Sequence, residues 1–318
     1  MNKHALISAH NLIKPFIHNT PVLTSEYFNS ITQSQLFFKC ENFQKTGSFK
    51  IRGATNAVLN LSPEQKQNGI VTHSSGNFAQ ALALAAKINN IKAYIVMPEN
   101  SLNSKLEAVK SYGAQILKCK PTIADREKTA DKLISAHNAA FIHPYNDKNI
   151  IAGHATATIE LLETYPDLEY IIAPVGGGGL ISGTALAAYY FGNNCKVIGA
   201  EPLEADDAYR SLISGKIEIN KTPNNTIADG LRTNLGDITF NFIRKYVQSI
   251  IRISEIEIIT AMQLVYERMK IIIEPSSAVA VAAAVKYKFN SNSKVGIIIS
   301  GGNADLSLYF NNIKKEQY

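Results

Sequence analysis

The sequence has no tryptophan, only three cysteines among its 318 residues, and no apolar run as long as a membrane span. Cys40, Cys119 and Cys195 are odd in number and far apart, and no CxxC or His–Cys cluster accompanies them. We therefore expect reduced thiols and no zinc site. A membrane helix needs about 20 consecutive apolar residues, and the N-terminal stretch lacks the apolar core and cleavage site of a signal peptide. These absences predict a cytoplasmic protein that does not cross a membrane.

A strong charge imbalance is also missing. The chain carries 32 Lys and Arg against 26 Asp and Glu, a formal net charge of +6. The basic residues are scattered, and the densest groups, such as Lys118 with Lys120, have no interleaved aromatic residues and no docking motif. We expect no nucleic-acid partner, and the positive balance favours at most anionic small molecules.

Short apolar segments alternate with helix-like stretches along most of the chain. The apolar segments are continuous, which is typical of parallel strands buried on both faces. Their alternation with helices predicts an open α/β architecture, and a prior of roughly 150 residues per domain predicts two domains. The predicted strands are 36–40, 69–72, 92–97, 115–118, 140–143, 170–174, 196–200 and 294–300.

Small and polar residues follow several of these predicted strands. HSSGN follows 69–72, VGGGG follows 170–174, EPLEADD follows 196–200, and GGNAD follows 294–300. Because ligands bind at the carboxyl ends of the strands in open α/β sheets, these segments predict one composite site.

Four consecutive glycines, Gly176, Gly177, Gly178 and Gly179, join a predicted strand to a predicted helix that continues with Leu180. Glycine is costly in conformational entropy, so a plain connector does not need four. Their backbone N–H groups can form an anion nest beside the positive end of the helix. A tight turn is the alternative interpretation. The loop lacks the ending of a P-loop and the spacing of a dinucleotide fingerprint, which predicts a ligand with a single phosphate.

Lys50 stands at the start of another predicted helix. A charged lysine without a partner is disfavoured there by the helix dipole, but the same place lowers the pKa of an amine and favours its use as a nucleophile or base. A solvated surface lysine is the alternative. The turn containing Ser74, Ser75 and Asn77 has more polar side chains than one helix cap requires, which predicts a carboxylate- or cofactor-binding loop.

Seven segments carry a family resemblance, in order from about residue 40 to residue 306: SFKIRGA, SSGN, PVGGGGL, EPLEADDAY, TIADGL, ERMKIIIEPSSA and SGGNAD. Together they resemble the pyridoxal 5′-phosphate (PLP) enzymes of fold type II, most closely the serine racemase and serine/threonine dehydratase branch. The resemblance implies a tryptophan synthase β-like α/β fold with the cofactor in the cleft between two open α/β domains. Residues 1–44 and 148–318 would form the large PLP-binding domain, and residues 45–147 the small mobile one. It also implies a homodimer and a small amino-acid substrate.

The resemblance assigns a role to each cofactor residue. Lys50 would carry PLP as a Schiff base, Asn77 would bond the 3′-oxygen, and Ser300 would meet the pyridine nitrogen. Because a hydroxyl does not stabilise a protonated pyridinium as a carboxylate does, the ring would be a weaker electron sink, which favours prompt loss of a β-leaving group. The full implied cofactor set is Phe49, Lys50, Asn77, Gly176, Gly177, Gly178, Gly179, Leu180, Gly230, Glu274 and Ser300.

Substrate and metal residues are implied in the same way. Ser74, Ser75, Asn77 and Arg126 would contact the substrate, although Arg126 is equally well read as a surface helix charge. Two carboxylates and one backbone carbonyl would hold a divalent cation: Mg²⁺, Ca²⁺ or Mn²⁺ suits such oxygen ligands. These ligands are Glu201, Ala205 and Asp207. From spacing alone, this acidic cluster would be a solvated loop.

The implied main activity is the deamination of L-threonine or L-serine, by elimination of water, to a 2-oxo acid and ammonia. Ser75 keeps two alternatives open: a serine racemase in which Lys50 and Ser75 serve opposite faces of Cα, and a 3-hydroxyaspartate dehydratase, which shares this serine. A catalytically silent PLP- or amino-acid-binding module is the non-enzyme alternative, and the intact Lys50 argues against it.

Three positions depart from the family pattern. Phe78 replaces the usual histidine of SSGNH, and His154 and Ala155 replace the usual Gln-Gly of IAGQGT. Phe78 removes a polar group close to the site, which leaves the substrate preference open. The chain ends soon after SGGNAD, so we expect no C-terminal amino-acid-sensing domain and no feedback inhibition by isoleucine.

Overall fold

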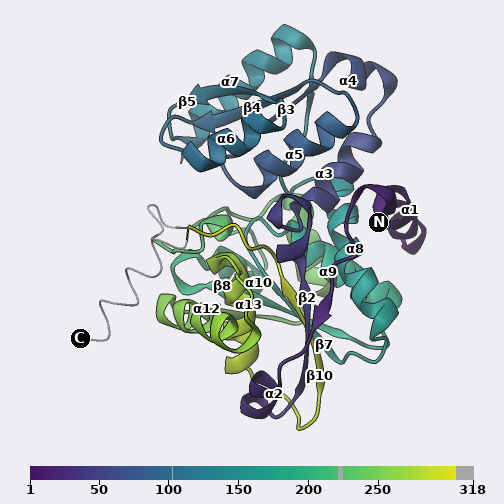
Figure 1. Ribbon diagram of the computed structural model, residues 1–318, viewed down its shortest axis with the longest axis vertical. Coiled ribbons are helices and arrows are strands. Elements are labelled where there is room, and N and C mark those ends of the chain that lie inside the picture. Colours follow the sequence, from purple (N-terminus) through teal and green to yellow (C-terminus); the bar gives the residue numbers. More distant parts are fainter. Residues whose placement is uncertain (102, 221–224, 306–318) are drawn as a thin grey trace.

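The computed structural model describes residues 1–101, 103–220 and 225–305. Two separate sheets organise them, the smaller in the upper part of Figure 1 and the larger in the lower part. No helix in these ranges is both long and apolar enough to cross a bilayer. The helices are α1 (Lys3–Ile13), α2 (Glu26–Thr32), α3 (Lys50–Leu59), α4 (Pro63–Asn68), α5 (Asn77–Ile88), α6 (Asn103–Ser111), α7 (Ile123–His137), α8 (Lys148–Thr164), α9 (Gly179–Phe191), α10 (Asp207–Ser214), α11 (Asp237–Tyr246), α12 (Glu255–Met269) and α13 (Pro275–Lys286).

The smaller sheet has four parallel strands in the order β5-β4-β3-β6. Alternate residues of β4 enter different cores: Ile95 packs in the cluster that contains α5, and Val96 in the cluster that contains α7. Both faces are therefore covered, which explains why the strand is apolar throughout. The strands are β3 (Ile70–His73), β4 (Ala93–Pro98), β5 (Gln115–Cys119) and β6 (Ala140–Phe141).

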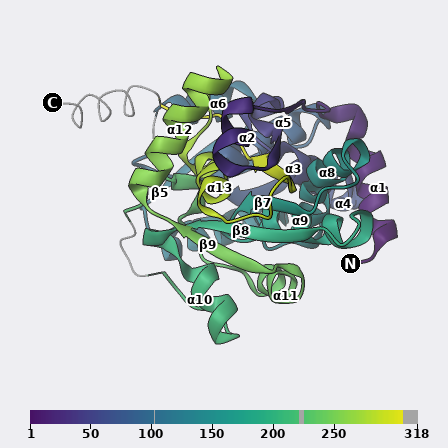
Figure 2. The same ribbon diagram turned by 90° about the horizontal axis from the view of Figure 1, so that it is seen from below.

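The larger sheet has six strands in the order β1-β2-β10-β7-β8-β9, and only β1 runs antiparallel to its neighbour. Ile172 of β7 packs in the core that contains α13, while Ile171 packs in the core that contains α9 and α11. Figure 2 shows this layering from below, with α13 and α11 on opposite sides of β7, β8 and β9. The strands are β1 (Val22–Leu23), β2 (Gln35–Cys40), β7 (Tyr170–Pro174), β8 (Lys196–Pro202), β9 (Ser249–Ile253) and β10 (Lys294–Ile299).

All eight predicted strands correspond to observed ones, with ends that differ by at most two residues. The prediction missed β1 and β9, which lie at the two edges of the larger sheet. The smaller sheet falls wholly within residues 45–147. The division into a large domain and a small mobile domain stays a prediction.

Helices α3 and α8 connect the two sheets and cross at very close range. A Cβ added at Gly153 of α8 would lie 2.5 Å from the backbone oxygen of Arg52 and 2.6 Å from the Cα of Gly53, both in α3. Only glycine permits this approach. The start of α3, and with it Lys50, is therefore seated directly on α8.

Candidate active site

One cavity of about 940 Å³ collects every predicted cofactor and substrate residue. It receives residues that follow the carboxyl ends of β3, β7 and β10, where ligands bind in open α/β sheets. The predicted residues that line it are Phe49, Lys50, Ser74, Ser75, Asn77, Arg126, Gly176, Gly177, Gly178, Gly179, Leu180, Gly230, Glu274 and Ser300. The predicted metal ligands lie outside this lining.

Lys50 is the first residue of α3 and faces this cavity with a partly buried side chain. The chain before it is held by backbone bonds to the segment after β10, from Phe49 N–H to the oxygen of Ser300 (2.9 Å) and from Gly302 N–H to the oxygen of Gly47 (2.9 Å). Burial lowers the pKa of Lys50 to about 8, although the negative charge of Glu274 opposes this shift. A substantial share of the amine is therefore neutral near physiological pH, as a nucleophile or base requires.

The backbone conformation and close contacts of the four-glycine loop leave no room for side chains. Gly178 has a φ of +88°, and a Cβ at Gly177 would lie 2.4 Å from the ring of Tyr145. The hydroxyl of Thr239 donates a hydrogen bond to the Gly177 oxygen at 2.8 Å and supports the loop from behind. Helix α9 begins at Gly179 without a side-chain cap. Its first N–H groups are thus free of a capping side chain, which fits a bound phosphate.

Asn77 is held in one orientation by two neighbours. Its amide nitrogen donates to both carboxylate oxygens of Glu274 (3.1 and 2.8 Å), and its amide oxygen accepts from the Asn303 side chain (2.9 Å). The Asn303 side chain also donates to the Thr46 oxygen (2.7 Å). Burial raises the pKa of Glu274 to about 7. The prediction did not include Asn303, although its place in GGNAD after a strand could have pointed to it.

Ser300 lies at the end of β10 in a buried hydroxyl pair. Its Oγ is 2.9 Å from that of Ser277, which donates to the Gly301 oxygen at 2.7 Å. Either hydroxyl can be the donor of the pair, so the Ser300 proton is available to a group bound in the cavity. Ser300 thus presents a neutral hydroxyl to the cavity and no ionised group.

The cavity lining also includes His143, to which the prediction gave no role in the site, and Arg126, which it assigned to the substrate. The Nδ1 atom of His143 accepts the N–H of Asn146 at 2.9 Å, so its proton sits on Nε2 when the ring is neutral. Burial lowers the pKa of His143 to about 4, with the charge of His73 next in effect, so the ring is neutral at pH 7. Arg126 lines the same cavity, and its Nε is buried without a hydrogen-bond partner among residues 1–101, 103–220 and 225–305.

The predicted metal ligands lie together at the end of β8. Glu201 is fully buried and accepts the N–H groups of Ala208 (2.9 Å) and Tyr209 (2.8 Å). Asp207 is also fully buried and accepts the Leu235 N–H at 2.9 Å. Burial raises the pKa of Asp207 to about 6 and that of Glu201 well above its usual range.

Neither of these two buried carboxylates has an ion-pair partner among the residues the structure describes, although the nearby Arg210 charge lowers the pKa of Asp207. A divalent cation would favour their ionised form. Ala205, whose carbonyl completes the predicted set, is buried beside them in a 3₁₀ turn, Leu203–Ala205. The described part of the chain has no cluster of three or more His, Cys, Asp or Glu side chains placed to hold a metal. Any cation here would rely on backbone oxygen as well.

The residues that depart from the family pattern lie in apolar surroundings. Phe78 packs in the core of the smaller sheet and reaches the cavity wall. His154 is fully buried, and its ring centre lies 4.6 Å from that of Phe49. Neither His154 ring nitrogen has a hydrogen-bond partner in the described residues, and burial lowers its pKa well below the usual value. His154 therefore supports Phe49 as a neutral ring.

Known proteins with similar sequences and structures include pyridoxal-phosphate dependent enzymes. Residues 13–301 match the family described as pyridoxal-phosphate dependent enzyme. The chain is 52% identical over 304 residues to the serine racemase of Dictyostelium discoideum, covering 94% of each chain. The crystal structure of the Dictyostelium enzyme covers 95% of this chain and 98% of its own, with a TM-score of 0.91.

Two other relatives have different activities. A beta-hydroxyaspartate dehydratase of Paracoccus denitrificans is 45% identical over 302 residues, covering 95% of this chain and 96% of its own. A threonine deaminase from T.th. is 38% identical, with a TM-score of 0.90 and coverage of 96% and 99%. The predicted fold class and family resemblance are confirmed. The chain belongs to the pyridoxal-phosphate dependent enzymes, in the fold type II group of serine racemases and serine/threonine dehydratases.

Proposed function

We propose that this protein is a serine racemase that also eliminates water from L-serine, with PLP attached to Lys50. The observation that carries the proposal is that Lys50 and Ser75 line the same cavity from different elements, the start of α3 and the loop after β3. This order reverses the sequence-based expectation, in which deamination of threonine or serine came first. The reason is that a serine racemase is 52% identical to the chain, whereas the threonine deaminase is 38% identical.

PLP, when bound, withdraws electrons from Cα of the amino acid and weakens its C–H bond. In the proposal, the neutral Lys50 amine takes this proton from one face of Cα. The hydroxyl of Ser75 gives a proton to the opposite face, or the reverse for the other enantiomer. The neutral Ser300 hydroxyl would hold the pyridine nitrogen by donating to it, and would therefore limit the electron demand that bound PLP supplies. In the competing outcome, Lys50 would pass the proton it has taken to the β-hydroxyl, which would leave as water.

In the proposal, the remaining residues would hold PLP and the amino-acid substrate. The N–H groups of the four-glycine loop would hold the phosphate. Ser74, Ser75 and Asn77 would hold the substrate carboxylate at the start of α5. Asn77 would bond the 3′-oxygen of PLP through the amide nitrogen that Asn303 and Glu274 keep in place.

A second candidate activity is the dehydration of 3-hydroxyaspartate. Its support is the guanidinium of Arg126, which lines the cavity with one N–H unpartnered among the residues the structure describes, and could take a second carboxylate. The 45% identity to a beta-hydroxyaspartate dehydratase agrees with it.

The deciding experiment incubates the enzyme with L-serine, D-serine, L-threonine and 3-hydroxyaspartate, and measures both the 2-oxo acid and the enantiomer ratio. Ser75→Ala should lower serine racemisation by about 100-fold or more, because general acid–base groups contribute about 10²–10⁴-fold. Elimination from L-serine, which needs only the Lys50 face, should stay within about tenfold of wild type. Equal loss of both activities would refute the two-base assignment, in which Ser75 serves the face of Cα opposite Lys50. Lys50→Ala is the control that should lose both.

We also propose a divalent cation at Glu201, Asp207 and the Ala205 carbonyl. Adding Mg²⁺, Ca²⁺ or Mn²⁺ to chelator-treated protein should raise the melting temperature, since a ligand at 100 times its Kd adds about 2.7 kcal/mol. Asp207→Asn should abolish this rise. Asp206→Asn is the matched control, because the Asp206 carboxylate is paired with Arg210 (2.8 Å) and should leave the response intact. An unchanged response in Asp207→Asn would refute the site.

The homodimer and the cytoplasmic location remain predictions. Sedimentation of the purified protein tests the first of them.

A further inference from the structure

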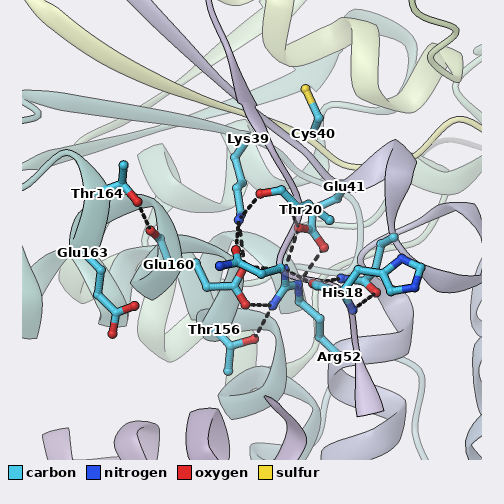
Figure 3. A network of polar contacts seen from close by, with 12 residues as sticks. His18, Thr20, Lys39, Cys40, Glu41, Arg52, Thr156, Glu160, Glu163 and Thr164 are labelled. Atoms are coloured by element: carbon cyan, nitrogen blue, oxygen red, sulfur yellow. Dashed lines mark hydrogen bonds and ion pairs between the residues drawn. The ribbon is translucent and has the colours of Figure 1, made fainter. Parts of the chain in front are cut away.

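A buried group of four charged side chains lies beneath the start of α3 (Figure 3). We call it the four-charge cluster: Lys39, Glu41, Arg52 and Glu160. Arg52 and Glu41 are 0% exposed, Lys39 is 1% exposed and Glu160 7%. Arg52 lies two residues after Lys50, and its partners come from elsewhere: Lys39 from β2, Glu41 from the turn that follows it, and Glu160 from α8. None of the proposed chemical steps uses this cluster.

Arg52 uses all five of its N–H groups, four of them in bonds within this cluster. Its Nε and Nη2 donate to the two oxygens of Glu41 at 2.6 and 2.8 Å. Its Nη1 and Nη2 donate to the two oxygens of Glu160 at 2.7 and 2.8 Å, and Nη1 also donates to the Thr156 hydroxyl at 3.0 Å. The guanidinium therefore forms two carboxylate forks that fix its plane as well as its position.

The cluster is balanced in charge. Lys39 donates to Glu160 at 2.7 Å and to the Thr20 oxygen at 2.8 Å, and the Thr20 hydroxyl donates to Glu41 at 2.6 Å. Two positive and two negative groups thus compensate each other, as burial requires. A buried ion cluster of this kind is weak evidence for stability, because apolar replacements often stabilise as well. What the directional forks supply is a defined geometry.

The geometry of α3 connects this cluster to Lys50. Residues two apart on an α-helix, with 3.6 residues per turn, point about 200° away from each other. Lys50 therefore faces the cavity while Arg52 faces the cluster on nearly the opposite side of the same turn. The close contact between Gly53 and Gly153 removes the remaining space for α3 to shift. A turn of α3 about its axis would move the amine and strain both forks at the same time.

We propose that Arg52 is a positioning residue whose two carboxylate forks, to Glu41 and Glu160, fix the rotation of α3 and so aim the Lys50 amine at the cofactor. This inference rests on the proposed attachment of PLP to Lys50. A mispositioned catalytic group can cost about 100-fold in rate for a displacement of about 1 Å. Charge at residue 52 is not enough for this role, since a lysine ammonium has three donors and cannot form two forks.

The main test variant is the double substitution Arg52→Met with Glu41→Gln. It removes one positive and one negative charge together and leaves the Lys39–Glu160 pair intact, so the protein should still fold. The matched control is Lys39→Met, which removes a buried charge from the same cluster but keeps every bond of Arg52. Arg52→Lys tests whether charge alone restores function.

Four quantities are measured on PLP-loaded protein, the first three of them at a temperature below melting. They are kcat and KM for L-serine, the fraction of Lys50 joined to PLP after borohydride reduction and peptide mass mapping, and the melting temperature. We expect the double variant and Arg52→Lys to lose about 10- to 100-fold in kcat, with a smaller fraction of Lys50 joined to PLP. KM should change little, because Ser74 and Ser75 lie outside α3. Lys39→Met should melt earlier but keep wild-type kcat and attachment.

Attachment and kcat within twofold of wild type in the folded double variant would overturn the proposal. So would losses that follow the melting temperature across all three variants, since that pattern describes a purely structural cluster. If the double variant does not fold, Arg52→Lys decides by the same criteria. A wild-type protein that shows no bond between Lys50 and PLP refutes the proposed function instead. A wild-type protein that attaches PLP but does not act on serine leaves the attachment measurement as the test of Arg52.

Discussion

The pKa of the Lys50 amine is set by its surroundings. Its amine lies 4.8 Å from the ring centre of Phe49, and burial lowers its pKa while Glu274 raises it. The net result, a pKa of about 8, leaves the amine protonated in acid and neutral in mild base. Only the neutral amine can attack the PLP aldehyde.

This pKa predicts how the cofactor-free protein takes up PLP. The initial rate of attachment, followed by the visible absorption of the Schiff base, should rise with pH and level off above about 8. Glu274→Gln removes the charge that raises the pKa of Lys50, so the inflection should move to lower pH. A rate that is constant from below to above this value would show that Lys50 is not the titrating nucleophile.

Among the secondary-structure elements, α8 contacts two of the helices whose first residues line the cavity, α3 and α9. It meets α3 at Gly153 and meets α9 near Ala155, where a Cβ on Gly183 of α9 would lie 2.7 Å from the Ala155 nitrogen. These two contacts join the helix that carries Lys50 to the helix that begins at the four-glycine loop. Small residues at the crossings therefore set the spacing between Lys50 and this loop.

Gly153→Ala should consequently destabilise the protein by about 1–3 kcal/mol, because the added methyl overlaps the backbone of α3. The urea midpoint should fall with little change in slope. Gly113→Ala is the comparison: it has open space but a φ of +81°, so only the backbone cost of about 1 kcal/mol applies. A smaller effect at Gly153 than at Gly113 would mean that α3 and α8 separate easily.

At the scale of the molecule, the cavity has walls from both sheets and their helices. Lys105 of α6 and Asp229 of the turn before Gly230 both line it, and their side chains form an ion pair of 2.6 Å between the two parts. Both side chains remain partly exposed, so we expect a modest, salt-sensitive contribution of about 0.2–1 kcal/mol. Such a pair joins the two parts of the molecule across the cavity.

Lys105→Met should raise KM for L-serine by about two- to fivefold and leave kcat nearly unchanged, because the pair lies at the rim. High salt should produce the same rise in the wild type and no further rise in the variant. A salt effect of equal size in both proteins would place its origin elsewhere.

The sequence by itself determined the α/β class, eight of the ten described strands and fourteen of the residues that line the cavity. These features depend on local patterns: apolar runs, glycine where backbone must approach a ligand, and polar residues after strands. The prediction missed the short strand β1 and the edge strand β9 because these strands bury less of their surface and have a weaker apolar pattern. Arg52 stood in a recognised motif, yet nothing near it in the chain indicated two carboxylate partners.

Only the tertiary structure decided which distant residues meet. Arg52 reaches Glu160 across 108 positions, and Asn303 reaches Asn77 across 226. Packing also placed His154 behind Phe49 and kept it neutral. A sequence pattern indicates the local secondary structure of each segment. A buried charge, however, needs a partner that only the folding of the whole chain brings within reach.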